Sequence, residues 1–336
     1  MAQHSYSSDA VSQDALSPPD HDYVVGVDLG GTNLRLALAD RTGSVVGRWS
    51  NRTVGVTDPS KIVAMIGSGV EQLLLQAGAS RSAIQALAVG APGITDAESG
   101  VVIATSYLMG WRNVPLRGLL ESCLGIPVAV DNDVNVAAIG ERWRGAAKQA
   151  RDFVFVAIGS GVGAGIVLNG QLYHGRGWTA GEIGYMLVPG SSETPVASGR
   201  PGPLEALVGG EGIKSQWQGL WSEERTSLPR DLTATQIFDH AQMADPLAQR
   251  ILQQAARALA YALYDIALVL NCPLFVLGGG VGMHPALRDA TRLILEQRGA
   301  RARLELACST LGEDAQLTGA IRLALDTANS RTTPLL

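Results

Sequence analysis

Two glycine turns with small polar neighbours have the residue types needed to bind phosphate groups. They read Gly30-Gly31-Thr32-Asn33 and Gly159-Ser160-Gly161. Glycine tolerates positive φ angles and lets backbone N–H groups approach an anion closely. Because the two turns occur between similar apolar runs in different halves of the chain, we expect two related lobes that hold one nucleotide between them.

Carboxylates lie beside the first turn and between the two turns. Asp28 ends the apolar run before the first turn, where a buried carboxylate needs a partner. Asn132 and Asp133 come after the apolar stretch 128–130, at the end of an expected strand, where open α/β sheets bind ligands. Asp133 is therefore a candidate proton acceptor, while the same residue types would also suit an Asx turn or a helix N-cap before Val134.

The first half of the chain must form the elements that position these groups. Branched residues on both sides of the first turn predict strand, turn and strand, and three strands are expected from 23 to about 50. Apolar spacing predicts a helix over 59–77, with Gly78 as its C-cap. Buried strands are expected at 84–90 and 128–130. This order predicts a mixed sheet flanked by helices.

The second half repeats this order from residue 153. Its pattern predicts a long amphipathic helix over 249–269 and a strand over 274–277. The strand runs into a third glycine turn, 278–282, which another helix follows. A final helix near 314–326 contains Gly319 and Ala320, small residues suited to close packing.

Two other nucleotide-binding folds do not fit these turns. A P-loop requires Gly-Lys-Ser/Thr, and no lysine of this chain follows a glycine. A dinucleotide-binding fingerprint requires GxGxxG between a strand and a helix, and the runs 159–165 and 278–282 lack that spacing. The remaining interpretation is a pair of hairpins that bind phosphate. The alternative is that these glycine segments are only tight turns.

Composition sets the class of protein. A length of 336 residues favours two domains, and 46% hydrophobic with 17% charged residues describes a soluble chain with substantial cores. The net charge of −5 and the absence of a basic stripe weigh against a nucleic-acid partner. No apolar run is long enough to span a membrane, and residues 1–22 lack the pattern of a signal peptide, so no membrane partner and a cytoplasmic location are expected.

The cysteines do not have the pattern of a disulfide framework. Cys123, Cys272 and Cys308 are scattered and include no CxxC pair, which predicts small buried side chains in a reducing compartment.

Four motifs, in this order, resemble the ROK family (repressor, open reading frame, kinase) from about residue 23 to 326. They read Asp28-Leu29-Gly30-Gly31-Thr32-Asn33, Asp131-Asn132-Asp133-Val134-Asn135, Ile158-Gly159-Ser160-Gly161-Val162-Gly163-Ala164-Gly165 and Leu277-Gly278-Gly279-Gly280-Val281-Gly282. The resemblance implies the α/β actin-like/hexokinase fold, a duplication of ribonuclease-H-like lobes around a central cleft. We expect a disordered tail (1–21), a small lobe (22–136, with the helix 314–326 packing back on it) and a large lobe (137–313).

The resemblance also implies an ATP-dependent, glucokinase-like hexose kinase. Asp133 would be the general base as a sugar hydroxyl, by resemblance the 6-hydroxyl, attacks the γ-phosphate of Mg-ATP. Asp28 would orient Mg²⁺ through water. The residues expected at ATP are Gly30, Gly31, Thr32, Asn33, Gly159, Ser160, Gly161, Gly279 and Gly280, with the helix after the last turn favouring the α-phosphate. Those expected at the sugar are Gly93, Asn132, Glu182, Tyr185 and Glu205.

Several positions depart from the family pattern. Ser160 stands where relatives usually have threonine, and Tyr185 where most have histidine. Tyr107 stands where relatives often have asparagine. The segment 188–203 lacks the cysteine cluster of the family, so no zinc site is expected and proline would rigidify this segment instead. Glu205 would also suit a solvated position at a helix start.

These departures leave several functions open. The alternatives are a kinase for N-acetyl-hexosamines or another sugar, a glucokinase that uses polyphosphate, and a non-catalytic sugar-binding ROK protein. A transcriptional regulator, the other branch of the family, would need a DNA-binding domain, and only about 22 polar residues precede the first strand. A homodimer is the expectation for this family.

Overall fold

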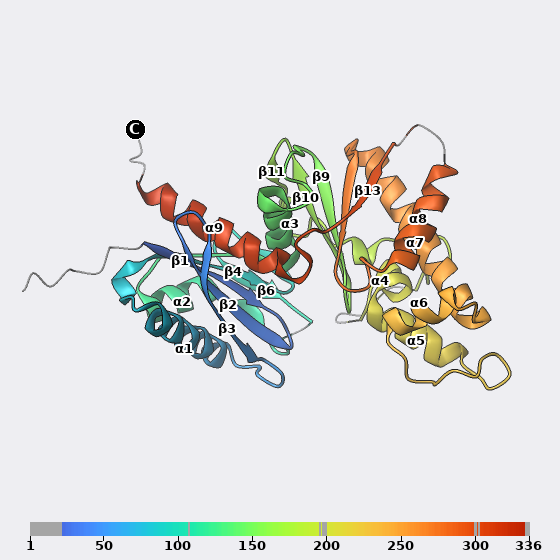
Figure 1. The fold of residues 1–336 in the computed structure, drawn as a ribbon, viewed down its shortest axis with the longest axis horizontal. Helices are drawn as coiled ribbons and strands as arrows, with labels where there is room; N and C mark the ends of the chain where they lie inside the picture. The colour runs from blue at the N-terminus through green and yellow to red at the C-terminus, as the bar shows by residue number, and fades with distance from the viewer. Residues whose placement is uncertain are drawn as a thin grey trace, which may run out of the picture.

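The computed structural model describes residues 22–332 except 107, 195, 197–199, 299–300 and 302. Within these residues, two five-stranded sheets form the two halves of the molecule (Figure 1). The tail 1–21 and Tyr107, on which the sequence made predictions, lie outside the described residues. The expected mixed α/β architecture in two similar halves is observed.

The first sheet has the strand order β3-β2-β1-β4-β8. Its strands are β1 (Tyr23–Leu29), β2 (Asn33–Asp40), β3 (Val45–Arg52), β4 (Ile84–Ala91) and β8 (Val128–Asn132). β1 pairs antiparallel with β2 and parallel with β4, which pairs parallel with β8. The carboxyl ends of β1, β4 and β8 therefore meet at one edge. A small side sheet contains β5 (Ile94–Asp96), β6 (Val101–Ala104) and β7 (Arg112–Val114).

Side-chain alternation in this sheet builds a core on each face. Val25 and Leu36 pack toward the helices α1 (Pro59–Ala77) and α2 (Leu116–Leu124), whereas Val24 and Ala37 pack toward α9 (Ala315–Thr332). The predicted limits of α1 are confirmed. Asp58 caps its first turn by accepting the N–H of Ser60, and Gly78 ends it at a φ of 64°.

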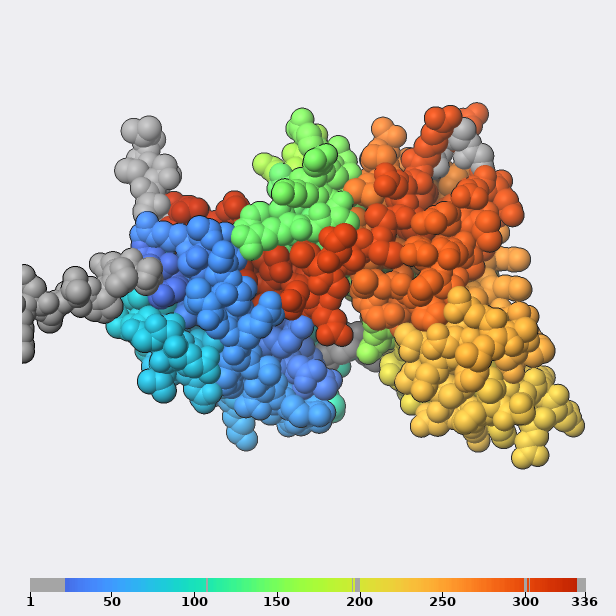
Figure 2. Space-filling view, in the orientation of Figure 1, coloured from blue at the N-terminus to red at the C-terminus, as the bar shows by residue number. Residues whose placement is uncertain are grey.

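The second sheet repeats the first, with the order β11-β10-β9-β12-β13. Its strands are β9 (Phe153–Ile158), β10 (Val162–Leu168), β11 (Gln171–Leu172), β12 (Leu274–Gly278) and β13 (Glu305–Cys308). The outer face is covered by α4 (Pro203–Val208), α5 (Gly210–Leu220), α6 (Ala234–Gln242), α7 (Pro246–Leu270) and α8 (Pro285–Glu296). Figure 2 shows these helices and their loops as the mass on the right.

Two helices lie between the sheets. α3 (Asp133–Arg144) packs on the inner face of the second sheet, against Phe153 and Phe155, and α9 packs on the first sheet. The two helices cross where Gly140 faces the carbonyl of Ala315. Together with the sheets and the outer helices they make five layers, which are visible in Figure 1.

Some sequence-based expectations need correction. The last helix extends to Thr332, beyond the predicted end at 326, and Ala328 continues its apolar face along the first sheet. α8 begins only at Pro285, so residues 281–284 separate its N-terminus from Gly279 and Gly280. Cys123 is exposed on α2 rather than buried. The proposed division near 136 falls inside α3, which contacts elements of both sheets, and it stays a prediction.

Candidate active site

The end of β8 and the start of α3 place two predicted residues side by side. Asn132 is the N-cap of α3, and its Oδ1 accepts the N–H groups of Val134 (2.9 Å) and Asn135 (3.1 Å). Its Nδ2 donates to the Gly93 carbonyl at 2.8 Å. The second hydrogen of this amide remains for a ligand hydroxyl. Helix capping and ligand binding are therefore compatible at this residue.

Asp133 occupies the first turn of α3, where the helix dipole favours a negative charge. Even so, burial raises the pKa of its carboxyl to about 7, and the negative charges of Asp28 and Glu182 contribute in the same direction. The Val134 N–H, which donates to Asp133 Oδ1 at 2.9 Å, opposes this rise. A carboxyl with a pKa near neutrality suits general acid–base chemistry.

Asp28, at the end of β1, is 7% exposed and has a cation for a partner. Arg35 Nε donates to its Oδ2 at 2.8 Å, and hairpin pairing places the two residues opposite each other. Burial nevertheless raises the pKa of Asp28, and Arg35 offsets part of this rise. Arg35 also donates to the Glu313 carbonyl at 2.7 Å, so it links this carboxylate to the segment before α9.

The first glycine turn is held in shape by its own backbone. Gly30 donates its N–H to the Asn33 carbonyl at 2.8 Å, and Thr53 Oγ1 donates to the Gly30 carbonyl at 2.8 Å. Thr32 and Asn33 are exposed, and Gly31 is half-buried. The turn thus presents its tip to solvent beside Asp28, as a phosphate-binding turn must.

The second and third glycine turns lie against each other. Val281 and Gly282 donate their N–H groups to the Ile158 carbonyl, at 3.1 and 3.0 Å. Gly279 has a φ of 77°, and a Cβ on it would lie 2.4 Å from the same carbonyl oxygen. Ser160 and Gly280 remain exposed.

The start of α5 completes this group of turns. Gly210 donates to the Gly159 carbonyl at 2.8 Å, and Glu211 donates to the Ser160 carbonyl at 3.1 Å. The turn that contains Gly161 is therefore supported from two sides by backbone bonds.

The predicted sugar-binding glutamates lie near each other in the second half. Glu205, in the first turn of α4, accepts the Val162 N–H on Oε2 at 2.8 Å. Glu182 precedes the 3₁₀ turn Ile183–Tyr185, and burial together with the charge of Glu205 raises its pKa. Since Glu182 also acts on the pKa of Asp133, the carboxylates of both halves face one space.

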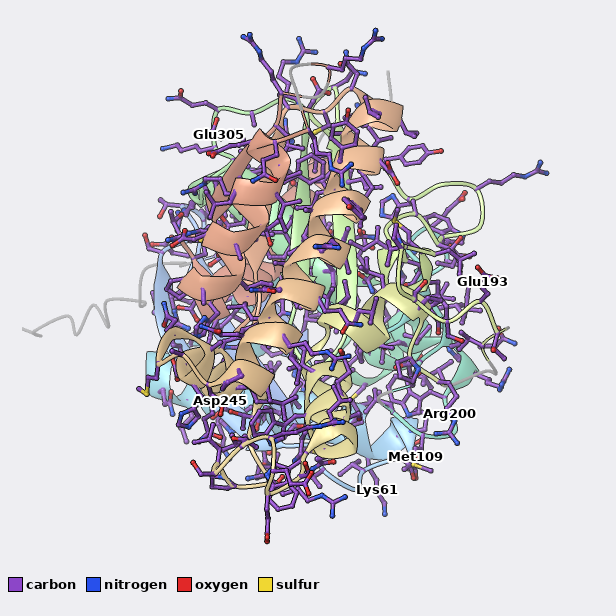
Figure 3. All side chains as sticks on the ribbon, turned by 90° about the vertical axis from the view of Figure 1, so that its right-hand side faces the viewer. Lys61, Met109, Glu193, Arg200, Asp245 and Glu305 are labelled. Carbon is purple, nitrogen blue, oxygen red and sulfur yellow. The ribbon has the colours of Figure 1, made fainter. Side chains whose placement is uncertain are left out.

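Tyr185 borders the same space and is 52% exposed. Burial, followed by the charges of Glu182 and Glu205, raises the pKa of its phenol, so the hydroxyl stays protonated and can donate a hydrogen bond. Among the described residues of the segment 188–203, Glu193 and Arg200 extend from the surface (Figure 3).

Sequence reasoning missed three residues of this region, namely Arg35, Asp131 and His174. Hairpin register could have identified Arg35, because a turn at Gly30 and Gly31 places it opposite Asp28. His174 Nε2 lies 2.7 Å from Asp131 Oδ2, although Asp131 belongs to β8 of the first sheet and His174 follows β11 of the second. No local pattern relates them.

No cluster of three or more histidine, cysteine or acidic side chains in the described part of the chain is arranged to hold a metal ion. Asp28 and Asp133 could share a Mg²⁺ that phosphates mainly ligate, since Mg²⁺ commonly uses one or two carboxylates together with substrate phosphates. The repulsion between these carboxylates favours a cation beside them.

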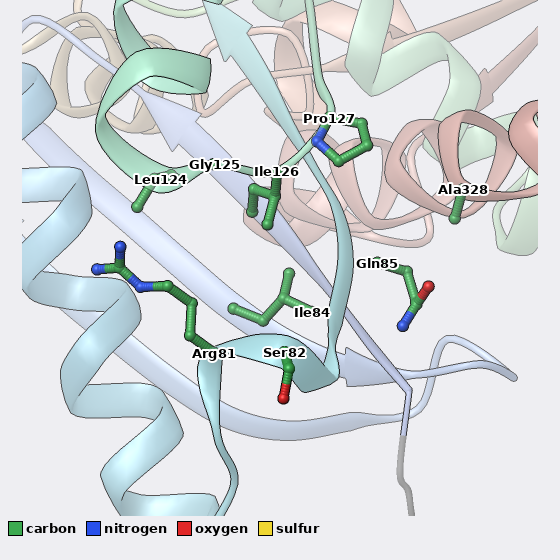
Figure 4. Close-up of a pocket in the computed structure, with 9 residues that line it drawn as sticks. All are labelled: Arg81, Ser82, Ile84, Gln85, Leu124, Gly125, Ile126, Pro127 and Ala328. Atoms are coloured by element: carbon green, nitrogen blue, oxygen red, sulfur yellow. The ribbon is translucent and has the colours of Figure 1, made fainter.

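A separate cavity lies at the opposite edge of the first sheet, where β4 and β8 begin (Figure 4). Arg81, Gln85 and Pro127 are among its lining residues, and Arg81 pairs with Glu71. None of the predicted site residues lines this cavity. Among the described helices, none is both long and apolar enough to cross a membrane.

Known proteins are similar to this chain over the range that contains the candidate site. The model of the ROK family matches residues 24–327. A glucokinase of Halalkalibacterium halodurans is 32% identical over 92% of this chain and 96% of its own length. An N-acetylmannosamine kinase of Escherichia coli is 30% identical over 90% of this chain and 98% of its own. The matched range contains every residue of the candidate site.

The solved structures include a ROK family glucokinase from Streptomyces griseus in complex with glucose and AMPPNP. It superposes with a TM-score of 0.75 at 26% identity and covers 90% of this chain and 99% of its own.

Proposed function

Because this chain belongs to the ROK family and is a sugar kinase with the actin-like fold, we propose that it transfers the γ-phosphoryl group of ATP to a hydroxyl of a hexose. The observation that carries this proposal is Asp133, a carboxyl with a pKa of about 7 between the phosphate-binding turns and the glutamates of the second half. The relative crystallised with glucose and AMPPNP supports the same choice of substrates.

Asp133 accepts the proton of the attacking hydroxyl. The oxygen, by resemblance that of the 6-position, then attacks the γ-phosphorus in line with the leaving oxygen of ADP. Proton removal in the transition state makes the hydroxyl a better nucleophile. Asn132, through its free amide hydrogen, orients the sugar against Asp133.

The remaining sugar contacts come from both halves. Carboxylates of Glu182 and Glu205 accept hydrogen bonds from sugar hydroxyls, and the protonated phenol of Tyr185 donates one. Gly93, whose carbonyl is held by Asn132, lines the side of the first sheet.

The glycine turns bind the nucleotide. Backbone N–H groups from Gly31 to Asn33 approach the β- and γ-phosphates, and those of Ser160 and Gly161 approach from the second half. The N–H groups of Gly30 and Gly159 are bonded within their turns, so these two residues would line the phosphates and hold the shape of each turn. Gly279 and Gly280 lie on the adenosine side. Mg²⁺, when bound with ATP, neutralises charge on the phosphates, and Asp28 would hold it through water.

Activity measured over a panel of sugars tests the proposal. Purified protein with Mg-ATP at pH 8 is assayed on glucose, mannose, N-acetylglucosamine and N-acetylmannosamine. We expect Asp133→Asn to lower kcat by about 10²- to 10⁴-fold, since that is the usual contribution of a general base. Equal activity of wild type and variant would reject Asp133 as the base.

One observation favours a second candidate substrate, N-acetylmannosamine. A kinase for this sugar is among the relatives, and Tyr185 stands where most members of the family have histidine. A higher kcat/KM for N-acetylmannosamine than for glucose would establish that alternative. Turnover with polyphosphate but not with ATP would change the donor, and sugar binding without turnover would indicate a non-catalytic protein.

The expectations about partners belong to the same proposal. The homodimer implied by the resemblance is tested by light scattering of the purified protein. The absence of a nucleic-acid partner is tested by a gel-shift assay with genomic DNA.

A further inference from the structure

One buried carboxylate beside Asp133 has no part in the steps above. Asp131 is the next-to-last residue of β8 and is 4% exposed. Its Oδ1 accepts the Asn132 N–H at 2.7 Å and the Asn135 amide Nδ2 at 3.1 Å. Through these contacts Asp131 supports the turn that carries Asn132 and Asp133.

The other carboxylate oxygen of Asp131 contacts the second half of the molecule. His174 Nε2 lies 2.7 Å from Asp131 Oδ2, and His174 follows β11 of the second sheet. The hydrogen bond to Asp131 raises the pKa of His174, which fits an imidazole nitrogen that donates to a carboxylate. The bond therefore joins the two halves of the molecule next to the base.

His174 belongs to the bridging loop, which we define as residues 173–182. The His174 carbonyl accepts the Ala180 N–H at 3.2 Å, which closes the loop, and Glu182 ends it. Trp178 has a φ of 60°, a costly conformation for a bulky side chain. Its ring packs edge-on against the His174 imidazole, with the centroids 5.2 Å apart. Strained backbone of this kind concentrates at functional sites.

We propose that His174 is a positioning residue, which holds the Asn132–Asp133 turn of the first half at a set distance from Glu182 of the second half by binding Asp131. This inference rests on the proposed function, because it names what aligns the general base with the sugar-binding glutamate. Without the imidazole, Asp131 loses its partner in the second half, and the bridging loop loses its side-chain bond to the first half. The two sides of the sugar site then move independently.

Substitution of His174 in the full-length protein tests this role. We expect His174→Ala to lower kcat/KM for the hexose by about 10- to 100-fold, because small displacements of reacting groups are costly. The KM for ATP should change less than about twofold, since the glycine turns do not depend on this bond. His174→Gln should recover most of the activity, because the glutamine Nε2 can donate to Asp131 from a similar place.

Thr226→Val provides the matched control. Thr226 Oγ1 donates to Asp245 Oδ2 at 2.8 Å, and Asp245 also accepts a backbone N–H at the start of α7. The variant therefore removes this bond and the one that the Leu228 N–H donates to Thr226 Oγ1 at 3.1 Å, both within the second half. It should lower Tm while leaving kcat/KM unchanged. If His174→Ala behaves in the same way, or if the KM for ATP and for sugar rise together, the positioning role is overturned.

Hydrogen–deuterium exchange of the ligand-free protein separates this inference from the proposed function. In His174→Ala, amide exchange should accelerate both in 128–136 and in the bridging loop, and in Thr226→Val in neither. This readout needs no sugar and no turnover, so it holds even if the substrate proposed above is wrong. Unchanged exchange in 128–136 would show that His174 does not hold the Asp133 turn.

Discussion

At the scale of single residues, the site depends on carboxylates placed close enough to affect one another. Asp133 ionises with difficulty because its half-buried carboxyl is desolvated and the charge of Asp28 repels it, and Glu182 and Glu205 make the other wall acidic. Such an arrangement lowers the free energy of unfolding because like charges repel. It favours catalysis, since a base with a pKa near 7 both accepts and releases protons readily. Arg35 limits the cost by pairing with Asp28.

The pH dependence of activity should report Asp133. Its carboxylate must be ionised to accept a proton, so kcat/KM should fall about tenfold per pH unit below about 7 and level off above it. Initial rates at subsaturating sugar from pH 5 to 9 measure this profile. The residual rate of Asp133→Asn should lack the inflection, and a wild-type kcat/KM that stays constant from pH 9 down to pH 5 would contradict the assignment.

The same residue should make stability depend on pH. Because the folded pKa of Asp133 lies above its unfolded value of 3.8, the folded state binds more protons between the two values. Its contribution to the free energy of unfolding therefore decreases as pH rises from about 4 to 7. Asp133→Asn removes this penalty, so we expect a gain of about 1–3 kcal/mol at pH 8 and little gain at pH 4. Urea unfolding of wild type and variant at both pH values measures this difference in the free energy of unfolding. A variant that is less stable than wild type at pH 8 would contradict the prediction.

At the scale of elements, the crossing of α3 and α9 decides how the two halves meet. A Cβ on Gly319 would lie 1.7 Å from the Val136 carbonyl oxygen, and one on Gly140 would lie 2.3 Å from that of Ala315. The helix axes approach closely only because both positions lack a side chain. α3 starts at Asp133, so a shift of this crossing would also move the candidate base.

Gly319→Ala should therefore destabilise the protein by about 1–3 kcal/mol and lower kcat, because the added methyl group forces the helices apart. Gly118→Ala is the control, since a Cβ there meets open space on α2. It should stabilise the protein by about 0.5–1 kcal/mol through the higher helix propensity of alanine. Chemical denaturation and steady-state rates of the two variants test this prediction. Equal effects of Gly319→Ala and Gly118→Ala on stability and kcat would contradict a close approach of α3 and α9 at Gly319.

At the scale of the whole molecule, the five layers are built from apolar cores. The two largest cores lie between each sheet and its outer helices, and smaller ones lie against α9 and α3. Burial of this kind supplies most of the stability of a domain. The folded state should therefore not depend on a bound metal ion.

A chelator should separate folding from activity. We expect EDTA to abolish phosphoryl transfer, because ATP then lacks Mg²⁺, and to leave Tm and far-ultraviolet circular dichroism unchanged. Added Mg²⁺ should restore the rate in full. A fall of Tm in EDTA, with recovery on addition of zinc alone, would instead reveal a structural metal site.

The amino-acid sequence by itself determined the elements and the motifs, because both depend on neighbours along the chain. Short runs of branched apolar residues predicted the strands beside the glycine turns, helical spacing predicted α1 to its last residue, and glycine predicted its C-cap. The position of the turn also sets the register of the β1–β2 hairpin, and this register places Arg35 opposite Asp28. The order of motifs was enough to recognise the family and the fold.

Only the tertiary structure decided how groups far apart in the sequence act on each other. The neutral pKa of Asp133 depends on burial and on charges from β1 and from the bridging loop, none of which local patterns place. The Asp131–His174 contact joins residues 43 positions apart, one on a strand of the first sheet and one in the loop after a strand of the second. Burial and pairing between sheets follow from packing of the whole chain, and for that reason the base and its support became visible only in the folded molecule.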